Sequence, residues 1–155
     1  MTDYKIRQAG PADAAMVRTM VVELADHQDE GRFVTSTEDD WRTALGRDDV
    51  IVLVAEGNDS PAGYVSALRR AHLWTGRDIL ALDDLYVREA HRDAGLGRTL
   101  MLELARLASP DNLTITWGLR LENEAGARFY NRLGATLRTK TLAAWSPDNY
   151  NPLLD

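Results

Sequence analysis

Residues 82–87 read LDDLYV, and after a short polar turn residues 92–97 read RDAGLG, followed by an amphipathic stretch. This order predicts a strand, a glycine-containing turn and a helix. Successive backbone N–H groups in such a turn, aimed along the positive end of a helix, form a site for phosphate or pyrophosphate. The sequence therefore predicts that the protein binds a phosphate-bearing cofactor.

Length and composition predict one domain over residues 1–155, since the chain has 155 residues of which 45% are apolar. The longest apolar run, residues 50–55, is far shorter than the roughly 18 residues of a membrane span. The first residues show no hydrophobic signal segment. We therefore expect a cytoplasmic protein with no membrane partner.

The chain contains no cysteine, which excludes disulfides, thiolate metal ligands and an enzyme-bound thioester. Its formal charge of −6 disfavours nucleic acid as a partner and suits a cationic one, although acidity also aids solubility. His27, His72 and His91 do not have metal-ligand spacing. No metal is expected.

Hydrophobic periodicity and turn residues predict a continuous α/β alternation without internal repeats. In the first part of the chain we expect strands at residues 4–8, 50–56, 62–70 and 78–87, with a turn at 57–61. A first helix should start at Gly10-Pro11 and fray at residues 26–30. A second, short helix should be capped by Ser36 and run to Leu45.

The second part of the chain is predicted to alternate helix, strand, helix and strand. A helix from Gly95 should end at Ser109-Pro110, before a strand at residues 113–119. A helix at residues 124–133 should end at Gly134, a residue suited to a left-handed cap. A last strand is expected at residues 136–145.

Two separated motifs resemble the GNAT superfamily of acyl-CoA-dependent N-acetyltransferases. One is the RDAGLG segment with Leu100 one turn later, and the other comprises Asn123, ARFY at 127–130 and LGA at 133–135. The resemblance implies a mixed α/β (α+β) GNAT fold with about four helices. Its sheet would be mostly antiparallel, with six or seven strands and a splayed parallel pair.

A finer resemblance, to the spermidine/spermine acetyltransferase branch, is carried by LDDLYV, YKIR at 4–7 and ELA at 23–25. That branch usually has glutamate where this chain has Asp83. Two other phosphate motifs fit less well. A dinucleotide fingerprint needs a third glycine where Leu100 stands, and a nucleotide P-loop needs Gly-Lys-Ser/Thr, which is absent.

The resemblance implies acetyl-CoA as co-substrate. Strand backbone would hydrogen-bond the pantetheine arm where two parallel strands splay, and turn amides would hold the pyrophosphate. The side chains of Arg92 and Arg98 would either add positive charge beside the phosphates or be solvated surface groups. Asn123 would be either a helix cap or a contact to the ligand. The expected cofactor-binding residues are Leu85, Tyr86, Val87, Arg92, Asp93, Ala94, Gly95, Leu96, Gly97, Arg98 and Asn123.

The motif match makes Tyr130 the expected general acid, because a phenol stays protonated at neutral pH and can donate to the departing thiolate. Periodicity alone would instead make it a core aromatic beside Phe129. The amine acceptor must lose a proton before it attacks, and the match favours Asp83 as the base, acting through water. Asp84, water alone or a solvated carboxylate remain alternatives.

Strand alternation predicts which residues share a face with the two aspartates. Asp83 should share one with Leu85 and Val87, and Asp84 should share the other with Leu82 and Tyr86, so that the two carboxylates would not both serve as bases.

Acceptor choice is expected to come from residues 26–40 and the loop at 71–78. The six acidic residues of the first segment would either attract a polycation or be a solvated helix end. Trp41 and Trp74 would either stack on the acceptor or pack within the protein. We expect acetyl transfer to a primary amine of a small polyamine-like, aminoglycoside-like or amino-acid-like molecule. The alternatives are a protein lysine or N-terminal acetyltransferase and a non-catalytic acyl-CoA-binding module. Relatives often dimerise, and the strand at 136–145 would suit a homodimer contact.

Overall fold

The computed structural model describes residues 2–154. The chain folds into two compact units, Met1–Gly118 and Leu119–Asp155. The first unit contains β1 (Tyr4–Gln8), α1 (Ala14–His27), α2 (Glu38–Leu45), β2 (Val50–Gly57), β3 (Ser60–His72), β4 (Arg77–Val87), α3 (Leu96–Ala108) and β5 (Thr114–Thr116). The second contains α4 (Glu124–Arg132) and α5 (Pro147–Tyr150).

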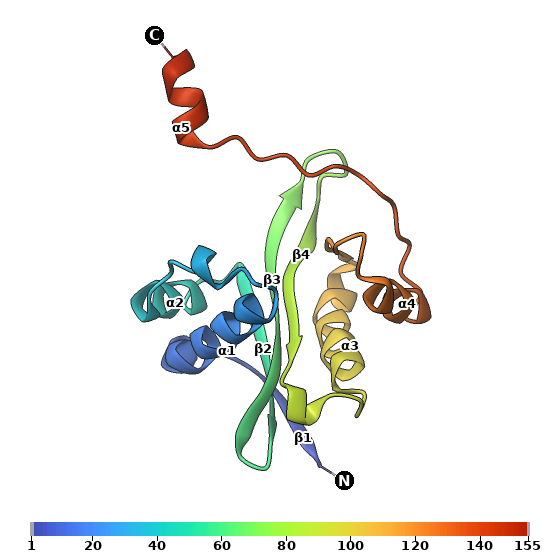
Figure 1. The fold of residues 1–155 in the computed structure, drawn as a ribbon. Helices are drawn as coiled ribbons and strands as arrows, with labels where there is room; N and C mark the ends of the chain where they lie inside the picture. Colours follow the sequence, from blue (N-terminus) through green and yellow to red (C-terminus); the bar gives the residue numbers. More distant parts are fainter. Residues whose placement is uncertain (1, 155) are drawn as a thin grey trace. The chain divides into compact units, whose positions relative to one another are not determined.

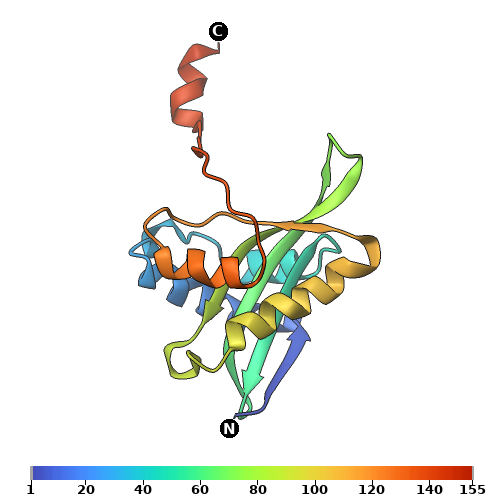
Figure 2. The ribbon, with the colours of Figure 1, turned by 90° about the vertical axis from the view of Figure 1, so that its right-hand side faces the viewer.

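The sheet of the first unit has the order β1-β2-β3-β4-β5. Its neighbours are antiparallel except β4 and β5, which run parallel. Helices α1 and α2 cover one face and α3 covers the other (Figure 1). Figure 2 shows α3 lying across its face, and the β3–β4 hairpin projecting beyond the other strands. The predicted mixed α/β class, with a mostly antiparallel sheet and one parallel pair, is confirmed.

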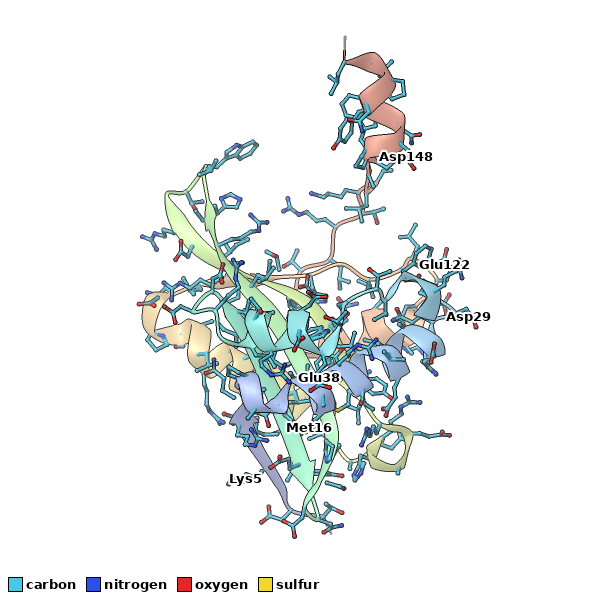
Figure 3. All side chains as sticks on the ribbon, turned by 90° about the vertical axis from the view of Figure 1, so that its left-hand side faces the viewer. Lys5, Met16, Asp29, Glu38, Glu122 and Asp148 are labelled. Atoms are coloured by element: carbon cyan, nitrogen blue, oxygen red, sulfur yellow. The ribbon has the colours of Figure 1, made fainter. Side chains whose placement is uncertain are left out.

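The core on the α1 and α2 side forms because the apolar stripe of α1 packs against alternate residues of the central strands. Val17 and Met20 are fully buried there with Val54 and Tyr64. Burial of each such side chain stabilises the fold by roughly 1.5–3 kcal/mol. Figure 3 views this face, with Met16 labelled on α1.

The start of α2 corrects one prediction. Its N-cap is Thr37, not Ser36: the Thr37 hydroxyl accepts a hydrogen bond from the Asp40 amide at 3.1 Å, and Asp40 accepts one from the Thr37 amide at 2.8 Å. This reciprocal capping box needs an acid three residues after the cap. Ser36 lies one residue too early for Asp40 and instead accepts from the indole N–H of Trp41 at 3.0 Å.

The other predicted elements of the first unit are present, with shifted ends. The β2–β3 turn is tighter than residues 57–61, because Asn58 and Asp59 both adopt positive φ and close the hairpin alone. β5 has three residues instead of seven. Among the described residues, no helix is both long and apolar enough to cross a membrane.

The last predicted strand, residues 136–145, is wrong. These residues have no regular structure, and the sheet formed within residues 2–154 has five strands instead of the expected six or seven. Threonine-rich composition favours a strand only where one face is buried, yet Leu142 and Trp145 are 91% and 67% exposed. The described part of the chain has five α-helices, because a short helix, α5, follows this segment.

Candidate functional site

The edge between β4 and β5 opens where the sequence predicted two strands to splay. The parallel pairing covers only Ile79 to Ala81 on β4, opposite Thr114 to Thr116 on β5. β4 then continues through Val87, paired with β3 on its other side. The second edge of residues 82–87 therefore has no strand partner within residues 2–154. An extended ligand can add to such an edge as a partial strand.

The opposite edge of this segment is held very close to β3. A Cβ atom built on Gly63 would lie 2.4 Å from the Tyr86 carbonyl oxygen. Only glycine permits that approach without a shift of the backbone. Gly63 therefore helps to fix the position of β4 where it leaves β5.

A turn and a helix start follow β4 closely. Asp93 and Gly95 adopt left-handed φ values of 63° and 77°, and Gly95 is the N-cap of α3. The first amides of a helix have no acceptor within the helix. Within residues 2–154, the backbone N–H groups from Asp93 to Arg98 donate to no protein acceptor. This anion cradle, residues 92–98, is open at Gly95, where a Cβ would meet nothing within 4 Å.

The two arginines of the cradle differ in their contacts. Arg92 Nε donates to the Val87 carbonyl oxygen at 3.0 Å, which ties the turn to the end of β4. Arg98 is exposed on the first turn of α3. The buried side chain of Leu96, 2% exposed, anchors the turn so that its amides keep their direction. The cradle thus offers a bound anion its backbone N–H donors, with the positive charge of the arginines near them.

A β-bulge at Asp83 changes the predicted alternation along β4. Leu82 pairs with Ala67 while Asp84 pairs with Ser66, so that Asp83 is an extra residue without a partner across the ladder. Ser66 and Ala67 are neighbours and point to opposite faces. Leu82 and Asp84 therefore lie on opposite faces, and the prediction that they share one is wrong.

Asp84 faces the buried tyrosines on the α1 side of the sheet. The Tyr64 hydroxyl donates to Asp84 Oδ2 at 3.1 Å, and the Asp84 amide donates to Ser66 Oγ at 3.2 Å. Burial raises the pKa of Asp84, the Tyr64 hydrogen bond opposes that rise, and the charge of Asp83 adds to it. Burial and the neighbouring Asp84 and Asp83 charges raise the pKa of Tyr64 as well.

Asp83 also has a raised pKa, because neighbouring atoms remove part of the hydration of its carboxylate. Its charge acts on both Asp84 and Tyr64. Two neighbouring carboxylates with raised pKa values thus lie in one electrostatic neighbourhood. Such pairs are a common feature of acid–base sites.

A cavity of about 170 Å³ lies beside Asp84. Its wall combines apolar and polar groups from α1 and the segment that follows it, and Glu30 and Asp84 supply carboxylates. The lining residues are Val21, Leu24, Ala25, Gln28, Glu30, Phe33, Val34 and Asp84. We call it the α1 cavity. A separate cavity of about 200 Å³ lies among β1, β2 and α3 and shares no residue with it.

The acidic segment after α1 contributes less to this cavity than the sequence suggested. Glu30 lines it, but Glu38 and Asp39 pair with Arg42, and Asp40 caps α2. In Figure 3, Glu38 is labelled on α2 and Asp29 beyond the end of α1.

The two tryptophans singled out near this segment do not line the cavity either. Trp41 is partly buried against the core, and Trp74 is 96% exposed in the turn of the β3–β4 hairpin.

The remaining predicted site residues lie on α4, in the second unit. Asn123 is its N-cap and accepts from the Gly126 amide at 2.9 Å, as expected of a structural cap. Tyr130 packs against Phe129 with ring centroids 5.1 Å apart. Burial raises the pKa of Tyr130, so that the phenol keeps its proton at neutral pH.

One group of contacts was missed at the level of sequence. Glu23 on α1 accepts from Arg88 through both carboxylate oxygens, at 2.7 and 2.9 Å, and from the Tyr86 hydroxyl at 3.1 Å. These hydrogen bonds and the Arg88 charge lower the pKa of Glu23 against the effect of burial. The available signal was helical spacing, since Glu23 follows the buried Met20 by three residues. Among the described residues, no group of three potential metal ligands occurs.

Comparison with known proteins identifies the family of this chain. The acetyltransferase (GNAT) family matches residues 18–135. A thialysine N-epsilon-acetyltransferase of Caenorhabditis elegans is 27% identical over 142 residues, which is 91% of this chain and 88% of that protein.

Solved structures show the same fold. An aminoglycoside acetyltransferase from an uncultured soil metagenomic sample has a TM-score of 0.80 at 12% identity, over 92% of this chain and 95% of that one. A ribosomal-protein-alanine N-acetyltransferase from Brucella melitensis has a TM-score of 0.74 at 17% identity, over 93% and 100%. With the family match over most of its length, the chain belongs to the acetyltransferase (GNAT) family and is an N-acetyltransferase.

Proposed function

We propose that the enzyme transfers the acetyl group of acetyl-CoA directly to a primary amine of a small cationic molecule. The observation that carries the proposal is the open second edge of β4 after Ala81, which leads to the anion cradle at residues 92–98. The open edge suits the amide groups of pantetheine, and the cradle suits a pyrophosphate. Leu85, Tyr86 and Val87 would hold the former, and the amides of the cradle with Arg92 and Arg98 would hold the latter.

The reaction needs an acid and a base on opposite sides of the thioester. The amine nitrogen attacks the thioester carbonyl, a C–N bond forms, the C–S bond breaks and the thiolate leaves. In the proposal Tyr130 protonates that thiolate, and Asp83 takes the ammonium proton through water. The raised pKa of Tyr130 supports the first role and the raised pKa of Asp83 supports the second. Asp84 would face the acceptor from the α1 cavity.

The acceptor is proposed to be a small amine because of the size and chemistry of the α1 cavity. About 170 Å³ with apolar side chains and carboxylates in its wall suits a short alkyl ammonium better than a folded protein surface. The relatives include acetyltransferases for thialysine and for aminoglycosides. The ribosomal-protein-alanine relative keeps a protein acceptor as the second candidate.

The functional protein is proposed to be a single N-acetyltransferase domain over residues 1–155 that forms a homodimer. Support for the dimer comes from the exposed apolar side chains of Leu142 and Trp145. Light scattering of the purified protein measures the mass directly, and a monomeric mass at micromolar concentration would contradict this part of the proposal.

The deciding experiment measures CoA release from acetyl-CoA with a polyamine, an aminoglycoside, a diamino acid and a lysine peptide. Turnover on one or more small amines is expected, with a bell-shaped dependence of rate on pH set by the base and the acid. Turnover on the peptide alone would establish the protein acetyltransferase. Tight binding of acetyl-CoA in calorimetry without CoA release from any amine would establish a binding module.

A further inference from the structure

We propose that Glu23 and Arg88 form a positioning bridge that fixes the α1 wall of the acceptor cavity against the strand that holds the cofactor. The inference rests on the proposed function, since it assigns the cavity to the amine and β4 to acetyl-CoA. Neither residue touches the reacting atoms in this scheme. Both act through the elements that they join.

Arg88 is fixed from two directions. It is the first residue after β4, and its backbone N–H donates to the Ala62 carbonyl on β3 at 2.8 Å. Its Nη1 atom donates to the Pro61 carbonyl at 2.9 Å. The remaining guanidinium nitrogens, Nε and Nη2, reach the two carboxylate oxygens of Glu23 at 2.9 and 2.7 Å. The bridge therefore ties α1 to β3 and β4 at once.

Glu23 lies within the part of α1 that forms the cavity wall. Val21, Leu24 and Ala25 flank it along the helix, and all three line the cavity. A displacement of the helix at Glu23 would carry this wall with it, because neighbouring residues of a helix move as one unit at a rise of about 1.5 Å per residue.

A second route connects the bridge to Asp84. The Tyr86 hydroxyl donates to Glu23 Oε2 at 3.1 Å, and the Tyr86 ring packs beside that of Tyr64 with centroids 6.1 Å apart. The Tyr64 hydroxyl donates in turn to Asp84, which also lines the cavity. The wall and the carboxylate of the cavity thus share one set of contacts.

Directional contacts are needed here because the apolar packing of α1 does not set its position along the sheet. Hydrophobic burial is non-directional, whereas an arginine–carboxylate fork has a defined geometry. The Glu23 and Arg88 side chains are 34% and 28% exposed, and partly exposed ion pairs contribute little stability. Their geometric effect is therefore expected to exceed their effect on stability.

Glu23→Gln and Arg88→Lys test the bridge, because each keeps the size of the side chain and removes the charged fork. Both should raise the KM for the small amine by about tenfold, since misplacement by about 1 Å can cost more than that in rate. The Kd for CoA should stay within about twofold, because the cradle is unchanged. The double variant should be no worse than either single one, because both remove the same contact.

Glu56→Gln is the matched control. Glu56 accepts from Arg7 at 2.9 Å, and its side chain is 27% exposed, which is comparable to Glu23. It joins β1 to β2 and belongs neither to the α1 cavity nor to the anion cradle. Its amine KM should stay at the wild-type value. An amine KM within twofold of wild type in Glu23→Gln, or an equal increase in Glu56→Gln, overturns the bridge.

A readout without catalysis separates this inference from the proposed function. Hydrogen exchange of backbone amides at residues 21–28 should accelerate in Glu23→Gln and Arg88→Lys, and remain unchanged in Glu56→Gln. If the wild type acetylates no small amine, the proposed function fails while this exchange pattern still supports the bridge. Unchanged exchange at residues 21–28 overturns the bridge in either case.

Discussion

The Tyr64 hydroxyl donates a hydrogen bond to Asp84 Oδ2 over 3.1 Å, from a ring that is fully buried in the α1 side of the core. A bond to the charged form of a carboxylate favours ionisation, so this contact opposes the rise in the pKa of Asp84 that burial causes. The buried tyrosine therefore helps to keep a carboxylate ionised at the proposed acceptor cavity.

Tyr64→Phe should raise the pKa of Asp84 further, because the variant loses the hydrogen bond that favours the charged carboxylate. If Asp84 attracts the ammonium group, amine affinity falls as pH falls through the Asp84 pKa, and this midpoint should move upward in the variant. Calorimetry across pH, with carboxyl NMR of Asp84, measures it. Tyr4→Phe is the control, because that hydroxyl contacts His91 instead. A midpoint that stays or moves down would contradict the role of Tyr64.

Gly95→Val should weaken CoA binding through the shape of the cradle. The left-handed φ of 77° is strained for a β-branched residue, and a rearranged turn would lose amide contacts to phosphate. The loss is expected to be roughly 1.5–3 kcal/mol, or about 10- to 100-fold in Kd.

Gly76→Val controls for the strain itself. Gly76 has a φ of 66° and, like Gly95, open space around a Cβ, but it lies in the β3–β4 hairpin turn. Calorimetry with CoA should show wild-type affinity for Gly76→Val, while thermal unfolding shows a similar destabilisation of both variants. Equal CoA affinity in both would remove the support for the cradle.

Tyr130→Phe should lower kcat by about 100-fold near neutral pH with little change in CoA affinity, because it removes only the acid that protonates the thiolate. The difference in kcat between the variant and the wild type should disappear at high pH, where the wild-type phenol is itself deprotonated. Tyr150→Phe is the control, since Tyr150 lies in α5 and its ring packs with Trp145, which precedes that helix. Full turnover in Tyr130→Phe would assign the residue to packing with Phe129.

Asp13→Asn should destabilise the first unit in a pH-dependent way. Asp13 accepts from Arg7 at 2.8 and 2.9 Å and from the Gly10 amide, and the hydrogen bonds to Arg7 are the main cause that lowers its pKa below the usual 3.8. A lowered folded-state pKa gives stability that is present above the unfolded value and lost as pH falls through the folded one.

The difference in unfolding free energy between wild type and Asp13→Asn should therefore be about 1–3 kcal/mol at pH 7 and shrink below a pH of about 3.8. Urea unfolding at a series of pH values measures it, with the exposed Asp48→Asn as control. A difference that persists unchanged at the lowest pH would show that the loss is not electrostatic.

Local patterns were enough to predict most of the first unit. The apolar stripe of α1, the strand at residues 50–56 and the glycine turn before α3 each carry their signal within a few residues, and each is present. The prediction of residues 136–145 failed because a strand also depends on a partner and a buried face. The bulge at Asp83 has no local signal either, since it is defined by pairing with Ser66 and Ala67.

The candidate site divides in the same way. The cradle is one continuous segment, so its residues could be named from the sequence. The contact of Glu23 with Arg88 joins residues that are 65 positions apart. Helical spacing places Glu23 relative to the buried face of α1, but it does not predict which distant residue it meets. The proposed roles of Tyr130 and Asp83 came from the motif match, because neither spacing nor composition separates a reactive side chain from a packed one.

The bulge at Asp83 changes which residues of β4, the odd-numbered or the even-numbered, face the α1 side of the sheet. Before it, the even-numbered Leu82 lies on the face opposite Tyr64. After it, the even-numbered Asp84 and Tyr86 lie on the same face as Tyr64. Tolerance to polar substitution should therefore change phase at this position when every residue from 79 to 87 is varied. Deleting Asp83 would make Leu82 and Asp84 neighbours on a regular strand, so both would keep their present faces and only the extra carboxylate would be lost.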